Sequence, residues 1–223
     1  MVKFIELNHR IVDGMVTCPG HPPVKISPFL SRADAKRKFG ETSSCLLDQI
    51  EMININGTYI DAALHCFDGG DCIADIPLEK LVDLPTIVIR IKVGRNYFDV
   101  DDFEEITEKL EGHAVLLHSG HDKYFSTVTY GENPPYLTVE GAKWLIDRGV
   151  IFIGIDSPLI DNFTKTTEYG TPVHHVILEA GAIVCEDLRG LEAMPDTGAL
   201  LTAVPPRVEM ASFPARVFAK ILE

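Results

Sequence analysis

The sequence predicts an α/β fold in which helices cover a sheet. From about residue 85 onward, short apolar and β-branched runs alternate with segments of helical periodicity. Capping residues and glycines separate these segments. The first 80 residues differ, because they are rich in Pro and Gly and contain only short apolar runs. We expect extra strands there, in runs such as "FIELNHRI" and "QIEMININGTYI", joined by long loops.

The first three elements of the alternating part follow one another directly. "PTIVIRIKV" (85–93) is β-branched and predicts a strand. "DVDDFEEITEKLEG" (99–112) has acids in its first turn, apolar residues at helical spacing and a final glycine, so it predicts a helix. "HAVLLHS" (113–119) is a short apolar run that predicts the next strand.

Two further helix and strand pairs complete the pattern. "TVEGAKWLIDRG" (138–149) begins at a threonine suited to the N-cap and ends at a glycine, which predicts a helix. "VIFIGID" (150–156) predicts a strand. "TPVHHVILEAG" (171–181) has Thr-Pro at its start and Gly at its end, and predicts a short helix. "AIVCED" (182–187) predicts the last strand of this part.

Composition narrows the class of protein. With 46% hydrophobic and 24% charged residues and no linker-like stretch, the 223 residues predict one domain, 1–223. The start lacks the apolar core of a signal peptide, and no apolar run is long enough for a membrane span, so we expect a cytoplasmic protein with no membrane partner. A net charge of −13, spread along the chain, argues against a nucleic-acid partner.

An acid and an imidazole interrupt the apolar stretch "GTYIDAALHCFDGG" (57–70). Asp61 and His65 are four residues apart, so they share a face in a strand and also in a helix. In a strand, Tyr59 shares that face. This arrangement is half of a candidate site.

The other half lies in "VHHVILEAGAIVCEDL". His174 stands in the first turn of a predicted helix, and Glu186 at the end of the strand that follows it. A helix and a strand joined by a tight turn pack side by side, so these side chains can approach each other. Asp61, His174 and Glu186 together are suitable donors for Zn, Mn or Fe, with His65 left as a base.

Plain structural roles compete with this hypothesis. A His-His pair on a helix is often solvated, and a strand-end Glu is often a surface residue. His118, His121 and Asp156 follow strands, where loop or cap roles are the more common ones. None of the five cysteines forms a CxxC pair, and they are expected to be free thiols.

Several stretches, in order, resemble a known family. The start "IELNHRIVDGMVTCPGHPPV" and the stretches "NGTYIDAALHCFDGGDCIADIPLEKLV", "LLHSGHDKYF", "LTVEGAKWLIDRGVIFIGIDSPLID" and "HHVILEAGAIVCEDLRGLEAM" carry the resemblance. The chain resembles the cyclase family, which includes kynurenine formamidase and isatin hydrolase, over nearly its whole length.

The resemblance implies a fold, an activity and a set of roles. The fold is a swivelling β/β/α domain with a mixed sheet flanked by helices, and the chain is expected to form a homo-oligomer, often a dimer. The activity is metal-dependent hydrolysis of small amides or lactones. Asp61, His174 and Glu186 match metal ligands, and His65 matches a general acid/base.

Three positions depart from the family signature, HxGTHxDxPxH, and at one of them Ala63 replaces the proline. Its first two histidines are Ile55 and Tyr59 in this sequence. In the family these histidines join the Asp in one metal site. Isoleucine cannot bind a metal and neutral tyrosine is a poor ligand, so this first site is expected to be absent or remade. A second site, formed by Asp61, His174 and Glu186, is expected to hold one ion or none.

Three hypotheses follow. In the first, the protein is a one-metal hydrolase in which His65 moves protons and Tyr59 donates a hydrogen bond to the oxyanion. In the second, the metal chemistry is lost and the protein is a divergent enzyme or a small-molecule binding protein. In the third, Cys66 acts as a nucleophile with His65 or His174.

Overall fold

Four parallel strands form the centre of the sheet, and they are the β-branched runs of the alternating part. The computed structural model describes residues 2–222. The four strands lie in the order β5 (Leu84–Arg90), β7 (Ala114–His118), β9 (Phe152–Ile155) and β10 (Ile183–Glu186). Every residue of β9 and β10 is buried, as expected for parallel strands covered on both faces.

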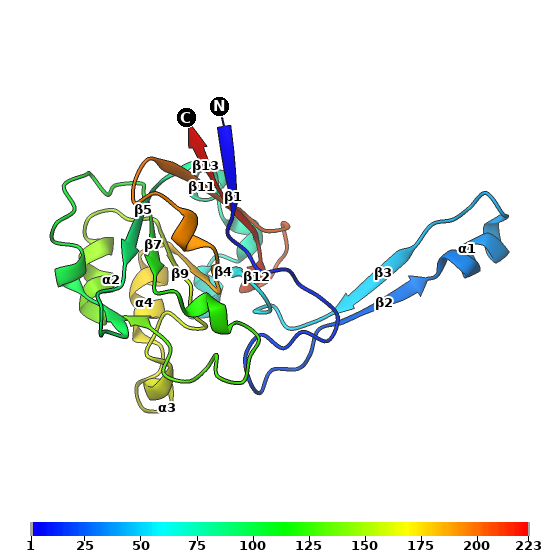
Figure 1. The fold of residues 1–223 in the computed structure, drawn as a ribbon, viewed down its shortest axis with the longest axis horizontal. Coiled ribbons are helices and arrows are strands. Elements are labelled where there is room, and N and C mark those ends of the chain that lie inside the picture. The colour runs from blue at the N-terminus through cyan, green and yellow to red at the C-terminus, as the bar shows by residue number, and fades with distance from the viewer. Residues whose placement is uncertain (1, 223) are drawn as a thin grey trace.

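Antiparallel strands extend this centre on both sides. Within residues 2–222 the sheet has nine strands. Beyond β5 lie β11 (Ala199–Val204), β13 (Arg216–Leu222) and β1 (Val2–Glu6). Beyond β10 lie β4 (Tyr59–Asp61) and β12 (Ser212–Pro214). Strands from the two ends of the chain are therefore neighbours, and both termini lie at one edge of the molecule (Figure 1). The sheet is mixed, as predicted.

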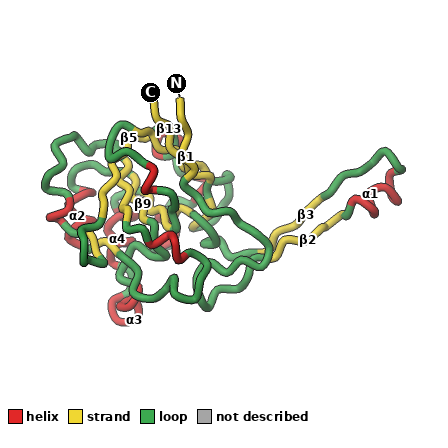
Figure 2. The backbone as a smooth tube through the Cα atoms, viewed as in Figure 1, coloured by secondary structure: helices red, strands yellow, loops and turns green. Residues whose placement is uncertain are grey.

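Two helices cover one face of the sheet (Figure 2). The first, α2 (Val139–Ile146), begins where the Thr138 side chain accepts a hydrogen bond from Gly141 N at 3.0 Å. The second, α4 (Pro172–Glu179), has proline at its first position, where the missing N–H costs nothing. The one-turn helix α3 (Thr166–Tyr169) precedes it. The two long helices match the predicted helices to within three residues at each end.

The predicted helix at 99–112 is wrong. The structure has only a 3-10 turn at Val100–Asp102 in this segment. Phe103 is nevertheless fully buried, so the apolar residues reach the core without forming a helix. In a helix, Asp101 would stand four residues from Glu105, and Glu104 four from Glu108, and like charges at this spacing repel. The aspartates bind Arg95 and Lys92 instead.

Residues 25–51 project from the body as an arm (Figures 1 and 2). Strand β2 (Lys25–Leu30) pairs with β3 (Leu47–Glu51), and helix α1 (Arg32–Phe39) lies at the tip. A second small ladder joins β6 (Tyr97–Phe98) to β8 (Tyr136–Leu137). The sequence predicted strands and loops in the first 80 residues, and α1 is an addition to that expectation.

No helix among residues 2–222 is both long enough and apolar enough to cross a membrane.

Candidate functional site

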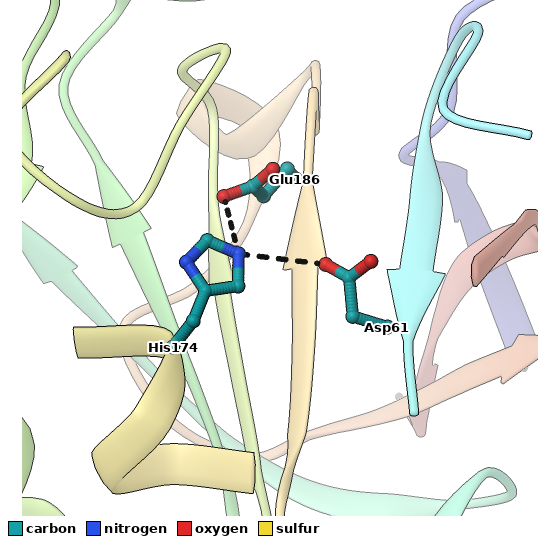
Figure 3. A group of neighbouring side chains, drawn as sticks. All are labelled: Asp61, His174 and Glu186. Atoms are coloured by element: carbon teal, nitrogen blue, oxygen red, sulfur yellow. Dashed lines mark ion pairs between the residues drawn. The ribbon is translucent and has the colours of Figure 1, made fainter. Parts of the chain in front are cut away.

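Neighbouring strands place two carboxylates on one face of the sheet. β4 and β10 run antiparallel, with Tyr59 opposite Glu186 and Asp61 opposite Val184. Residues opposite each other point to the same face, and so do residues two apart. Asp61 and Glu186 therefore both point to the face that α4 covers, and α4 brings the His174 imidazole next to both carboxylates (Figure 3).

The three side chains meet in a buried cluster. His174 Nε2 lies 3.3 Å from Glu186 Oε1 and 3.6 Å from Asp61 Oδ2. Asp61 and Glu186 are 0% exposed and His174 is 1% exposed. Each residue offers one potential ligand atom, and these atoms all lie within 4.8 Å of one another. The structure thus brings together the three residues that the sequence analysis proposed as metal ligands.

Asp161 sets the orientation of His174. Its Oδ2 lies 2.6 Å from His174 Nδ1, and its carboxylate also accepts the backbone N–H groups of Val173 and His174. The carboxylate therefore caps the start of α4 and leaves Nε2 pointing at the cluster. Burial alone would lower the pKa of His174, but Glu186, Asp161 and Asp61 outweigh it and raise that pKa well above its ordinary value.

Asp61 Oδ2 is the unusual atom of the cluster. It is buried, and no residue within 2–222 gives it a hydrogen bond. Leaving a buried carboxylate oxygen unpaired costs on the order of 1–3 kcal/mol or more. A divalent ion between Asp61, His174 and Glu186 would satisfy it, and one nitrogen with two carboxylates suits Zn, Mn or Fe. The residues present therefore fit a single divalent ion.

Tyr59 binds Glu186 rather than facing solvent. Its hydroxyl donates a hydrogen bond to Glu186 Oε2. Burial, and then the nearby Glu186 carboxylate, raise the pKa of Tyr59 well above its ordinary value, so the phenol is neutral. Glu186 Oε1 accepts the Ile160 N–H at 2.6 Å. Both Glu186 oxygens thus have protein partners, and each retains a lone pair.

His65 lies beside the cluster on the 3-10 turn Ala63–His65. Its Nδ1 is 3.1 Å from Ser212 Oγ, whose own proton is donated to Asp61 Oδ1. A hydroxyl has one proton, so Ser212 must accept at Nδ1, which fixes the imidazole with its proton on Nδ1. This leaves Nε2 as the basic nitrogen, on a side chain that is 34% exposed.

Ser212 and Asp161 complete the site, and sequence reasoning assigned neither of them a role. Ser212 is 147 residues from its partner His65 and belongs to no motif. Its only sequence signal would be a polar residue in the short apolar run of β12. Asp161 follows a strand, and the register of α4 relative to that strand is what makes it a partner of His174.

The other residues that the sequence analysis considered lie outside the cluster, and hydrogen bonds hold most of them in place. His121 Nε2 lies 2.8 Å from Tyr130 O, and His118 Nδ1 lies 2.8 Å from an Arg90 nitrogen. Asp156 accepts the backbone N–H groups that follow β7, and burial raises its pKa to about 6. Burial raises the pKa of the Cys66 thiol, which disfavours a thiolate nucleophile.

The sequence matches a known protein family. The family model for cyclases matches residues 5–162, more than half of the chain. The chain belongs to the cyclase family. The matched residues include Tyr59, Asp61 and His65, whereas His174 and Glu186 lie beyond them.

Relatives of this cyclase-family chain cover most of its length. The kynurenine formamidase of Geobacillus thermodenitrificans is 27% identical over 192 residues, which are 84% of this chain and 83% of the relative. That of Bacillus cereus is 24% identical over 211 residues, 91% and 90% of the two chains. These relatives are hydrolases and support an enzyme of that class.

Solved structures share the fold. Isatin hydrolase A from Labrenzia aggregata, bound to benzyl benzoate, has a TM-score of 0.84 at 21% identity, covering 100% of this chain and 94% of that one. A structure described as a potential metal-dependent hydrolase with cyclase activity has a TM-score of 0.79 at 24% identity and full coverage of both chains. The predicted cyclase fold is thereby confirmed.

Proposed function

We propose that this protein is a metal-dependent hydrolase of a small cyclic or N-acyl amide, or of a lactone. The observation that carries the proposal is the unpaired Asp61 Oδ2, buried opposite His174 Nε2 at 3.6 Å, with the basic nitrogen of His65 beside it. The kynurenine formamidase relatives support the substrate class.

Asp61, His174 and Glu186 would hold the ion. When bound, a divalent ion supplies Lewis acidity, which lowers the pKa of water and polarises a carbonyl group. Asp161 keeps His174 Nε2 directed at the ion position, since it holds Nδ1 at 2.6 Å. The carboxylates of Asp61 and Glu186 are fully buried, so they would hold the ion away from bulk solvent.

His65 is proposed as the general acid/base. Its Nε2 takes a proton from the attacking water and returns it to the leaving nitrogen or oxygen. Ser212 holds the Nδ1 proton in place and links the imidazole to Asp61, whose carboxylate stabilises the protonated ring. The His65 side chain is 34% exposed, so a substrate that enters beside the cluster can reach its imidazole.

Tyr59 is the second proposed catalytic residue, as a donor to the oxyanion. Its proton is directed at Glu186 in this structure. Donating to a substrate oxygen requires the hydroxyl to turn away from that carboxylate. Because the pKa of Tyr59 is raised, the proton is present throughout the neutral range.

The second candidate function is a metal-free enzyme or small-molecule binding protein. The hydrogen bond from Tyr59 to Glu186 favours this candidate, because the Tyr59 hydroxyl already occupies one oxygen of a proposed metal ligand. Ile55 also makes this side of the site less polar than the family signature. A cytoplasmic location, a small-molecule partner, and the lack of nucleic-acid or membrane partners remain predictions from the sequence.

An assay on purified protein separates the two candidates. Protein loaded with Zn, Mn or Fe is offered N-formyl arylamines, isatin-type cyclic amides and lactones, beside a chelated sample and the Glu186→Gln variant. We expect hydrolysis by the loaded protein only. Binding of such compounds without hydrolysis under every metal condition would favour the binding protein. A matched control is Glu192→Gln, which changes an exposed acid outside the site.

A further inference from the structure

A pocket of about 420 Å³ lies between the first turns of α2 and α4. The short helix α3 borders it, and all three helices lie on the same side of the molecule (Figures 1 and 2). Pockets that bind small molecules have volumes of about 300–1,000 Å³, so this one is large enough for a compact ligand. Asp161 lines the pocket, whereas the three proposed metal ligands and His65 do not. The pocket is therefore separate from the candidate site, although Asp161 belongs to both.

One wall of the pocket is aromatic and well supported. Tyr136 of β8 lines it, and the ring centre of Tyr136 lies 6.1 Å from that of Tyr97 on the neighbouring strand β6. The guanidinium carbon of Arg95 lies 5.1 Å from the Tyr97 ring centre, and Asp101 and Asp102 pair with that guanidinium. Because neighbouring side chains support this wall, its shape does not depend on a ligand.

The other walls offer apolar surface and a second aromatic ring. Val139 at the start of α2 and Pro172 at the start of α4 line the pocket. Tyr169 of α3 also lines it, and this residue is 69% exposed. Aromatic rings pack favourably with their centres about 4.5–7 Å apart, so the two tyrosines can hold a ring that enters between the helices. The walls therefore favour an aromatic ligand.

Two opposite charges border the pocket without ion-pair partners. Lys165 and Glu140 both line it. Among the ion pairs of residues 2–222, none includes either side chain, and the two do not pair with each other. A charged ligand group that meets one of them would not have to displace an existing ion pair. A ligand that carries both a carboxylate and an ammonium group matches the two charges.

We propose that this pocket binds an aromatic amino acid as a zwitterion. The carboxylate of the ligand pairs with Lys165, and its ammonium group pairs with Glu140. The ring packs against Tyr136, between the first turns of α2 and α4. The bound ligand lies next to Asp161 but does not reach the ion position, so the pocket is a second site beside the proposed hydrolytic centre.

Titration of the metal-free protein with L-phenylalanine, followed by NMR in excess chelator, tests the proposal. We expect one molecule per chain with a dissociation constant of about 1 mM or tighter, and the largest amide shifts at residues of the pocket such as Gly170 and Val173. 3-Phenylpropionate lacks the ammonium group, phenethylamine lacks the carboxylate and L-alanine lacks the ring. Each should bind more weakly by about fivefold or more. No saturable binding, or equal affinity for these three compounds, would overturn the proposal.

Two variants test the two charged contacts separately. Lys165→Met should weaken the binding of L-phenylalanine but not that of phenethylamine, which has no carboxylate to lose a partner. Glu140→Gln should weaken the binding of L-phenylalanine but not that of 3-phenylpropionate. A general disturbance of the pocket would weaken all compounds alike, so this pattern distinguishes recognition from a structural effect. The controls Lys143→Met and Glu179→Gln change exposed residues of α2 and α4 outside the pocket, and should bind like wild type.

His65→Ala shows which of the two sites holds the ligand. This variant should bind L-phenylalanine like wild type, because His65 does not line the pocket. The fluorescence of Trp144, on α2, checks that each variant is folded. Loss of binding in His65→Ala together with full binding in Lys165→Met would place the ligand in the candidate site and overturn the proposal. These measurements need neither metal nor turnover, so their outcome is independent of the proposed hydrolase activity.

Discussion

At the scale of single residues, His65 and Asp61 share one hydrogen-bonded chain through Ser212. The hydroxyl fixes which nitrogen of His65 is basic, and the same hydroxyl occupies one oxygen of Asp61. The other oxygen stays unpaired and faces His174. In the proposed mechanism, His65 Nε2 carries out proton transfer and Asp61 Oδ2 is the ligand atom.

Replacing His65 by alanine should separate these two tasks. We expect His65→Ala to keep its metal content, because His65 is not one of the three ligand candidates. Turnover should fall by about a hundredfold or more, the scale of general acid/base catalysis. Metal analysis and steady-state kinetics on the same samples check this. The control His113→Ala changes an imidazole outside the site, and equal losses in both variants would contradict the assignment.

Removing the hydroxyl of Tyr59 should cost stability. In Tyr59→Phe, Glu186 Oε2 loses its donor inside the core, so the free energy of unfolding of the metal-free protein should fall by about 1–3 kcal/mol. Urea unfolding with excess chelator measures it. Tyr169→Phe, at a residue 69% exposed, should change stability little. An unchanged stability in Tyr59→Phe would show that the bond to Glu186 is not made in solution.

At the scale of elements, α4 and β10 form a unit that the tight turn after α4 holds together. The helix supplies His174 and the strand supplies Glu186, while Asp161 fixes the start of the helix by accepting two of its N–H groups. The Asp161 carboxylate thus caps the N-terminus of α4 and also holds the His174 imidazole. The orientation of His174 depends on the position of the helix.

Asp161→Asn should therefore weaken metal binding without unfolding the protein. An asparagine keeps one accepting oxygen for the helix but cannot supply the charge that supports His174 Nδ1. We expect the metal dissociation constant to rise by about 10–100-fold. Titration with a competing chelator measures it, and circular dichroism checks the fold. Asp147→Asn, at the exposed end of α2, should bind metal like wild type.

The hydrophobic periodicity of the sequence predicted the four central parallel strands and their two helices well, because each of these segments fits only one type of element. β5, β7, β9 and β10 are continuous β-branched or apolar runs, and the segments of α2 and α4 each have a threonine before the helix and a glycine after it. The segment 99–112 has helical spacing too, but its like charges and its aspartate bonds to Arg95 and Lys92 outweigh that spacing. Tertiary contacts, which a linear pattern does not contain, decided this segment.

The candidate site was predictable only in part, for a related reason. Asp61, His174 and Glu186 occur at the ends of predicted elements, where adjacent elements bring side chains together. Ser212 lies on an edge strand that pairs with β4, and the local periodicity of a sequence does not reveal the order of strands in a sheet. Its bond to His65 could not be inferred before the topology was known.

At the scale of the whole molecule, strands from both ends of the chain close the same sheet. β1 pairs with β13, and β12 pairs with β4 beside the candidate site. We therefore predict that residues 1–223 unfold as one domain. Thermal unfolding followed by Trp144 fluorescence and by circular dichroism should give one coincident transition. Two separated transitions would show that the chain contains independent units.

Metal stoichiometry tests the central claim most directly, that Asp61, His174 and Glu186 form a single-ion centre. Protein loaded with Zn, Mn or Fe and then desalted is analysed by mass spectrometry for metal per chain. We predict one tightly held ion in wild type, its loss in Asp61→Asn, and its retention in Asp156→Asn, which changes a buried acid outside the site. Two tightly held ions in wild type, no ion at all, or full retention in Asp61→Asn would contradict the account.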